Sequence, residues 1–132
     1  MPKPSQCTLT TGAPAPLPGL YSQAVRAGNM LYTSGSVGMT PEGQMVQGTV
    51  ADRTRQVIAN LEAILKASGM GLENVVKANI YLSHLSRDFD AVNEVYKELM
   101  PEPKPARTCV GVAELPAGGT DVEIEFVAYD GN

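Results

Sequence analysis

Two ionisable side chains in the last third of the chain are the residue types that a site for a small carboxylic acid needs. Arg107 alternates with Cys109 and Gly111 in the run ARTCVG, and Glu123 stands in the run VEIEF. An arginine is always charged, and its planar fork matches both oxygens of a carboxylate. A glutamate can exchange protons with a reacting group. The pair therefore predicts a carboxylate grip with an acid-base group beside it.

The two runs are predicted to be the strands of one antiparallel pair. Each alternates apolar and polar residues, and the turn residues Pro116–Gly119 separate them. Arg107 and Glu123 would then lie on neighbouring strands and could share one side of the pair. The pattern alone favours a simpler interpretation, a cross-strand ion pair on a solvated face that contributes little to stability.

The rest of the chain predicts the elements that must position these residues. The signals are proline clusters for extended segments, alternation for strands, and a 3.6-residue apolar stripe for helices. In order, we expect an extended lead-in over 1–18, strands at 21–25 and 30–34, a helix capped by Thr49 and ending near Ser68, a strand within 72–82, a helix over 89–99 capped by Ser86 or Asp88, and the two final strands. This order predicts an α+β fold of one domain, 1–132, in which two helices cover one face of a single sheet.

Composition narrows the function. A chain of 132 residues is long enough for one domain with a real core, and its net charge of −4 argues against a general grip on nucleic acid. Two cysteines and one histidine provide neither a disulfide framework nor a usual metal-ligand spacing. No stretch has the length of a membrane span, and the N-terminal residues lack a targeting pattern. We expect a soluble intracellular protein, and the low charged fraction of 18% fits a surface covered by copies of the chain.

Several other polar residues have both a structural and a functional interpretation. Asn93 inside the second helix is typical of a solvated or locally bonded side chain, and Tyr21 and Ser34 are typical of packing or edge positions. Cys109, with no histidine near it in sequence, is typical of a small buried residue rather than a nucleophile. His84 lies in a polar turn without the partners of a catalytic triad.

The motifs taken together resemble the reactive intermediate deaminase (Rid, or YjgF) family, and within it the RidA subgroup. They follow the family order from about Pro14 to the C-terminus. They are GLYSQAV (19–25), YTSG (32–35), VK (76–77), FDAVNEVY (89–96), PAR (105–107) and VEIE (122–125). The resemblance implies a chorismate-mutase-like fold and a homotrimer with clefts between subunits. It also implies hydrolysis of the enamine and imine products of pyridoxal-phosphate dehydratases to 2-oxo acid and ammonia.

Roles carried over from the family fall on residues of those motifs. The resemblance implies that Arg107 holds the substrate carboxylate, that Glu123 handles the water, and that Cys109 contributes main-chain contacts. Three further residues line the cleft in the family, and here they are Tyr21, Ser34 and Asn93. Because of this resemblance, we prefer the hypothesis that Arg107 belongs to a site over the hypothesis of a surface ion pair. Free imines already hydrolyse in water, so positioning is sufficient, and we expect neither a metal nor a cofactor.

The chain departs from the family pattern at three places. Ser36 follows the Thr-Ser-Gly motif where glutamine is usual, and the segments 83–88 and 117–121 each appear one residue longer than usual. The two loops tolerate extra length, but the shape of the cleft and the preferred imine are left open.

Two other functions remain as alternatives. One is a metabolite-binding or regulatory trimer that uses the same cleft without turnover. The other is the ribonuclease activity attributed to some relatives, which the acidic composition and the single histidine disfavour. A cytoplasmic location is expected, with a mitochondrial pool left open.

Overall fold

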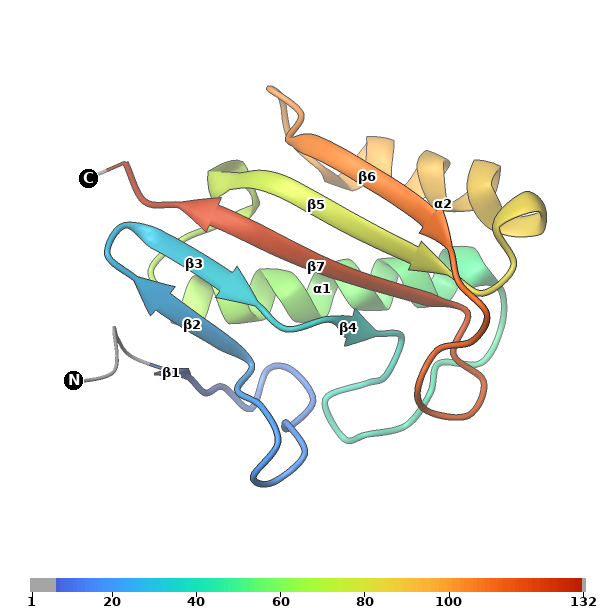
Figure 1. The fold of residues 1–132 in the computed structure, drawn as a ribbon, viewed down its shortest axis with the longest axis horizontal. Coiled ribbons are helices and arrows are strands. Elements are labelled where there is room, and N and C mark those ends of the chain that lie inside the picture. The colour runs from blue at the N-terminus through green and yellow to red at the C-terminus, as the bar shows by residue number, and fades with distance from the viewer. Residues whose placement is uncertain (1–6, 132) are drawn as a thin grey trace.

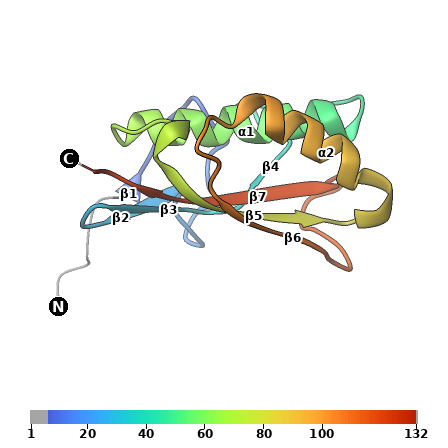
Figure 2. The same ribbon diagram turned by 90° about the horizontal axis from the view of Figure 1, so that it is seen from above.

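The computed structural model describes residues 7–131, in which two helices lie on one face of a single mixed sheet (Figure 1). The elements in chain order are β1 (Cys7–Thr8), β2 (Ala24–Ala27), β3 (Met30–Thr33), β4 (Ser36–Val37), α1 (Val50–Ala67), a short 3₁₀ helix (Leu72–Asn74), β5 (Val75–Leu82), α2 (Leu85–Leu99), β6 (Ala106–Gly111) and β7 (Val122–Tyr129). Figure 2, which views the sheet edge-on, shows both helices on the same side of it. The predicted α+β architecture with one helix-covered face is confirmed.

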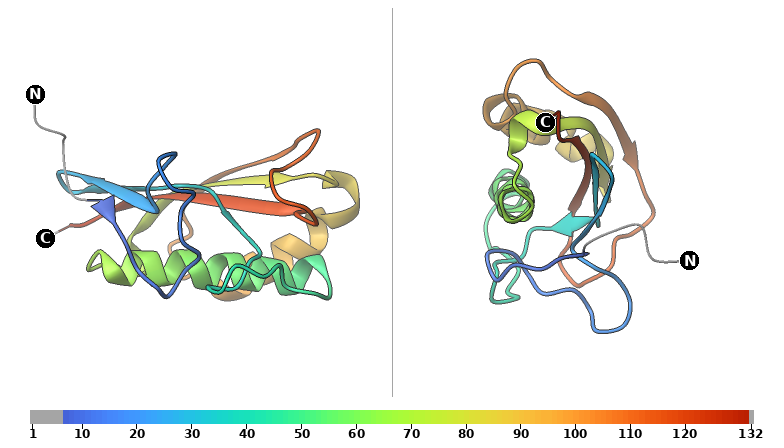
Figure 3. Two further views of the ribbon diagram at one scale, coloured as in Figure 1. Left: turned by 90° about the horizontal axis from the view of Figure 1, so that it is seen from below. Right: turned by 90° about the vertical axis from the view of Figure 1, so that its left-hand side faces the viewer.

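The long strands β5 and β7 form the centre of the sheet. The strand order is β1-β2-β3-β7-β5-β6, and β4 pairs with β7 outside this path. On β7 the residues Val122, Ile124 and Phe126 are almost completely buried beneath the helices. Glu123 and Glu125 alternate with them and therefore point to the other, open face. Figure 3 shows from below that both helices run along the sheet and leave that second face uncovered.

Helix α1 forms for the reasons that the sequence indicates. Thr49 caps its first turn, because the Thr49 hydroxyl accepts a hydrogen bond from the Asp52 amide at 3.2 Å and the Asp52 carboxylate accepts one from the Thr49 amide at 2.9 Å. The predicted apolar stripe is buried against the sheet. Beyond the helix, Gly69 adopts a positive φ of 77°, a backbone conformation that favours glycine.

Helix α2 begins earlier than the sequence predicts. Its N-cap is His84, so neither Ser86 nor Asp88 caps it, and Asp88 is instead buried in an ion pair with Arg87. The expected stripe residues Val92, Val95 and Tyr96 are buried, but Phe89 is 39% exposed. Phe89 therefore belongs to a different surface, described below.

The predicted antiparallel pairing of the last two strands is wrong. Strand β6 pairs in parallel with β5, and β5 also pairs with β7, so β5 separates the two strands. The reason is the connection through α2. A strand, a helix and a second strand form a crossover that places the second strand parallel to the first. The loop over 112–121 then carries the chain across β5 to the other side.

Smaller differences concern the N-terminal part. The predicted strand at 21–25 begins only at Ala24, while β3 matches its expected position. Residues 7–8 of the expected lead-in pair with β2 as β1, and Ser36–Val37 form β4. Residues 9–18 of the lead-in form no helix or strand, and residues 1–6 lie outside the described residues.

Candidate functional site

Arg107 lies on the helix-covered side of the sheet and stacks against α2. Its register partner is Ala78 on β5, which is also paired with Phe126, and both of these residues are buried beneath the helices. The Arg107 guanidinium carbon lies 5.0 Å from the ring centre of Tyr96 and 5.9 Å from that of Phe89. Aromatic faces attract such a cation. The two rings therefore hold the guanidinium without neutralising its charge.

Asn93 belongs to the same cluster, one helical turn from Phe89 and from Tyr96. The Asn93 side-chain oxygen and the Tyr96 hydroxyl are both buried without a hydrogen-bond partner among the described residues. Buried polar atoms are nearly always bonded, so these two are available to another molecule. Within residues 7–131, Arg107 likewise has no carboxylate within ion-pair distance. A free guanidinium beside two unbonded polar atoms is a receptor for an anion that also hydrogen-bonds.

Cys109 follows Arg107 on the same side of β6. It packs against the core, and burial raises the pKa of its thiol despite the nearby charge of Arg107. A raised pKa keeps the sulfur protonated and a poor nucleophile. Its side chain therefore has the character of a small buried residue. We call Phe89, Asn93, Tyr96, Arg107 and Cys109 the arginine cluster.

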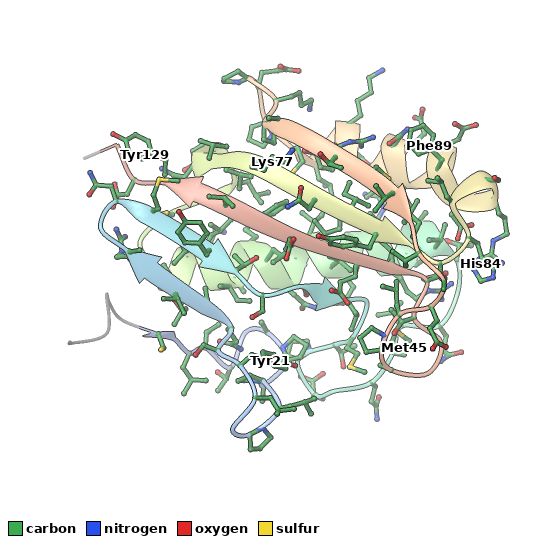
Figure 4. The ribbon with its side chains drawn as sticks, in the orientation of Figure 1. Tyr21, Met45, Lys77, His84, Phe89 and Tyr129 are labelled. Atoms are coloured by element: carbon green, nitrogen blue, oxygen red, sulfur yellow. The ribbon has the colours of Figure 1, made fainter. Side chains whose placement is uncertain are left out.

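A second group of polar residues lines a cavity of about 930 Å³. Of the predicted site residues, Tyr21, Ser34 and Glu123 line it, while Asn93, Arg107 and Cys109 do not. The remainder of the lining comes from Pro14, Ala15, Leu17, Gln23, Thr33, Gly35, Ser36, Val37, Met39, Ile64, Pro116, Ala117 and Glu125. We call this hollow the glutamate cavity. Figure 4 labels Tyr21, which lines the cavity, and Phe89 of the arginine cluster, and the two lie in different parts of the molecule.

Glu123 is fitted closely into the cavity wall. A β-carbon on Gly35 would lie 2.2 Å from the Glu123 Oε2 atom, so the carboxylate can occupy this place only beside a glycine. Burial raises the pKa of Glu123, and the charge of Glu125 raises it further. Within residues 7–131 no protein group donates a hydrogen bond to this carboxylate. An acid with a raised pKa and free oxygens can exchange protons with a ligand.

The segment that carries Tyr21 and Ser34 is held by a buried glutamine that the sequence argument did not single out. Gln23 is 3% exposed. Its amide nitrogen donates to the carbonyls of Thr10 and Pro14, at 3.0 and 2.9 Å, and its side-chain oxygen accepts from the Thr10 amide. The Ser34 hydroxyl donates to the Ser22 carbonyl at 2.6 Å. Gln23 belongs to the GLYSQAV motif (19–25), so the family resemblance included it. The chemistry of a glutamine side chain alone gave no reason to select it.

An ion pair fixes the start of β7 and with it the position of Glu123. Arg53 on α1 donates two hydrogen bonds of 2.8 Å to the two oxygens of Asp121. Arg53 also donates to the carbonyls of Val46 and Gly48. Asp121 ends the loop that precedes β7, and Ala117 of this loop lines the glutamate cavity. The loop therefore contributes to the cavity wall.

The structure separates the two charged residues instead of pairing them. Arg107 points to the helices and Glu123 to the open face, and β5 lies between their strands. The proposed cross-strand ion pair is therefore absent, and the two residues do not meet in one copy of the chain. The predicted site residues are therefore divided between the two faces of the sheet.

Other site types find no support in the part of the chain that the structure describes. No group of three metal-ligating side chains occurs among residues 7–131. The His84 ring hydrogen-bonds the neighbouring Ser83 hydroxyl at 3.0 Å rather than a triad partner. Over the same residues, no helix is both long and apolar enough to cross a bilayer.

Comparison with known proteins identifies the family. The family model described as Endoribonuclease L-PSP matches residues 10–130. The chain belongs to this family, the Rid (YjgF) family. The resemblance that the motifs carry is thereby confirmed.

Three relatives illustrate how members of the family are named. A protein of Dermatophagoides farinae called 2-iminobutanoate/2-iminopropanoate deaminase is 44% identical over 94% of this chain and 95% of its own. The protein mmf1, mitochondrial, of Schizosaccharomyces pombe is 43% identical over 85% of this chain and 69% of its own. The crystal structure of RidA from the Antarctic bacterium Psychrobacter sp. PAMC 21119 superposes with a TM-score of 0.87. It is 45% identical and covers 94% of this chain and 98% of that one.

Proposed function

We propose that the chain is an enamine and imine deaminase that releases 2-oxo acid and ammonia from 2-iminobutanoate or 2-iminopropanoate. The observation that carries the proposal is the pair of half-sites, an unpaired Arg107 on one face and an unpaired acid, Glu123, on the other. The name of the 44% identical relative of Dermatophagoides farinae supports the same reaction.

The reaction requires both half-sites, so we place it between two copies of the chain in a homotrimer. The arginine cluster of one copy would face the glutamate cavity of its neighbour. The open sheet face, which carries the exposed Tyr32, Val110 and Tyr129, offers apolar surface for such packing. A low charged fraction of 18% fits the same burial.

The chemistry follows from the groups in the two half-sites. Arg107 binds the substrate carboxylate through two parallel charge-assisted hydrogen bonds. Glu123 of the neighbouring copy positions a water molecule and exchanges protons with it and with the substrate nitrogen. Water oxygen bonds to the carbon of the C=N group, the nitrogen gains protons, and the carbon–nitrogen bond then breaks. Imine and water thus become 2-oxo acid and ammonia.

The remaining predicted residues complete the binding surface. Asn93 has a buried oxygen free to accept a hydrogen bond from the ligand, and Tyr21 and Ser34 form the opposite wall. The Ser34 hydroxyl already donates to the Ser22 carbonyl, so toward a ligand it acts as an acceptor. Main-chain groups at Cys109 are proposed to contact the carboxylate held by Arg107.

The deciding experiment generates the imine in place with a threonine or serine dehydratase and measures 2-oxo acid release with and without this protein. We expect acceleration that Arg107→Ala abolishes. Binding of a 2-oxo acid without acceleration would support the alternative of a metabolite-binding trimer. A parallel incubation with RNA tests the family's ribonuclease description, which the net charge of −4 disfavours.

A further inference from the structure

Two carboxylates lie side by side on the open face of β7, and the neighbouring strand donates hydrogen bonds to only one of them. Glu123 and Glu125 are two residues apart on one strand, so their α-carbons lie about 7 Å from each other. Both line the glutamate cavity. Two nearby acids in a half-buried place do not ionise independently, because the first negative charge opposes the second. Which acid holds the proton depends on the hydrogen-bond donors around each.

Two side chains of β5, those of Asn79 and Tyr81, donate hydrogen bonds to Glu125. Asn79 lies directly opposite Glu125 in the ladder and donates to its Oε1 atom at 3.2 Å. Tyr81 lies directly opposite Glu123, yet its hydroxyl reaches diagonally and donates to the same Oε1 atom of Glu125 at 2.6 Å. Glu123 receives no donor from any residue in 7–131. Both donors come from residues that pair with β7 in the sheet ladder, so the unequal hydrogen bonding of the two glutamates follows from the strand register.

The bond also keeps the tyrosine in its donating form. The hydrogen bond to Glu125, with burial and the two negative charges, raises the pKa of Tyr81 to about 12. At neutral pH the phenol is therefore protonated and donates its hydrogen bond to the Glu125 carboxylate. Donors favour the charged form of an acid, whereas burial beside an existing charge favours the neutral form. When two neighbouring acids have unequal environments of this kind, one of them keeps its proton and the other is ionised.

No other charge on the surrounding elements reverses this division. Tyr81 and Val37 pair with Glu123 in the ladder, and Glu125 and Tyr21 are the other ionisable side chains that line the cavity with it. The cation on β5, Lys77, is level with Val127 and bonds the Thr108 hydroxyl. Arg107 of the same copy is on the other face, and the proposed function places Arg107 of a neighbouring copy against the substrate carboxylate.

We propose that Tyr81 and Asn79 fix the negative charge of the pair on Glu125, and that Glu125 acts as a positioning residue by keeping the proton on Glu123. The inference rests on the proposed function for the use of that proton. Neutral Glu123 gives its proton to the imine nitrogen, which makes the carbon more electrophilic. The resulting carboxylate then takes a proton from the attacking water, so the acid is regenerated while oxygen bonds to carbon.

The test follows the carboxyl carbons of both glutamates by NMR during a pH titration of the intact protein labelled with ¹³C-glutamate. Glu123→Gln and Glu125→Gln assign the signals. The matched control is Glu42→Gln, which removes the same charge from an exposed turn outside the cavity. We expect Glu123 to titrate above the usual range of a glutamate side chain. Glu125→Gln should lower the titration midpoint of Glu123 by clearly more than Glu42→Gln does.

A second variant tests the hydrogen bonds without removing a charge. Tyr81→Phe deletes the 2.6 Å bond to Glu125 and keeps the ring. The negative charge is then held less firmly on Glu125, so the titration midpoint of Glu123 should fall. In dehydratase-coupled turnover, Glu125→Gln should shift to lower pH the limb of the kcat profile that reports Glu123. Thermal melts establish that each variant is folded before it is titrated.

The outcomes separate this inference from the proposed function. A Glu123 midpoint that responds equally to Glu125→Gln and Glu42→Gln would overturn the inference even if the protein turns over imines. The expected titrations in a protein without turnover would instead leave the proton arrangement in place and refute the deaminase assignment.

Discussion

Two inactive variants should restore each other's activity if one site takes its charged groups from two copies of the chain. Arg107→Ala removes the carboxylate grip from every site, and Glu123→Gln removes the proton-exchanging group. Neither variant alone should accelerate imine hydrolysis. In assemblies that contain both, some sites combine the intact Arg107 of one copy with the intact Glu123 of its neighbour. The separation of these residues by β5 and by the plane of the sheet is the reason to expect this.

The expected recovery follows from counting. In an equal random mixture, one copy carries an intact arginine with a probability of one half. Its neighbour carries an intact glutamate with the same probability, so about a quarter of the sites in a closed ring are complete. If both groups came from one copy, no site would be complete. The matched control mixes wild-type protein with the double variant, where a two-copy site predicts about a quarter of wild-type activity and a one-copy site about half.

The assay co-expresses the two variants with different tags, isolates assemblies that carry both tags, and measures 2-oxo acid release from an imine generated in place. Tag selection removes the unmixed assemblies. In every trimer that carries both variants one of the three sites is complete, so the expected fraction rises from about a quarter to about a third. Circular dichroism and melting temperature establish that both variants are folded. An inactive mixture, together with about half activity in the wild-type control, would refute the two-copy site.

Four further predictions concern single residues. Arg107→Lys should recover little of the loss from Arg107→Ala, which is about 2–5 kcal/mol in kcat/KM, because a point charge cannot replace the fork; steady-state kinetics of both variants measure this. Gly35→Ala should displace the Glu123 carboxylate and lower kcat by about 10²-fold with little change in melting temperature, since the new β-carbon meets only the end of a flexible side chain. Asp121→Ala should lower the free energy of unfolding by about 3 kcal/mol in urea titrations, because it leaves Arg53, 15% exposed, without its partner. Glu123→Gln should raise the free energy of unfolding at pH 7 but not at pH 3: a folded pKa raised above the unfolded value gives stability that is lost as pH rises through it, and glutamine avoids that loss. Equal differences at the two pH values would contradict the raised pKa.

The sequence predicts the local elements well where a single physical signal controls them. The Thr49 cap and the apolar stripe of α1 lie close together in the chain, and the structure has both. The same holds for the alternation on β7, which correctly places Glu123 opposite Val122 and Ile124. The start of α2 was less predictable. Ser86 and Asp88 are good capping residues, but Asp88 instead forms an ion pair with Arg87, its neighbour in the chain.

The pairing of strands was predicted less well because it is a non-local choice. A turn between two alternating runs favours a hairpin, but the crossover through α2 gave β6 another partner. Alternation orders residues on one strand and does not say which side faces the helices. For Arg107 that side depends on its register with Ala78. The sequence therefore named Arg107 and Glu123 as candidates but wrongly placed them on adjacent strands. The sequence did not single out Gln23 or Tyr81, because each acts through hydrogen bonds to residues of other segments.

The placement of the half-sites also bears on the symmetry of the assembly. In a two-fold dimer the same surface patch meets itself, so one patch would have to contain both Arg107 and Glu123. These residues lie on opposite sides of the sheet, which makes such a patch hard to form. A contact between the arginine cluster of one copy and the glutamate cavity of the next is instead head-to-tail, and head-to-tail contacts close into rings or extend into filaments. A ring leaves no half-site unpaired. The proposed trimer is such a ring, in which every Arg107 has a Glu123 from its neighbour and activity depends on assembly.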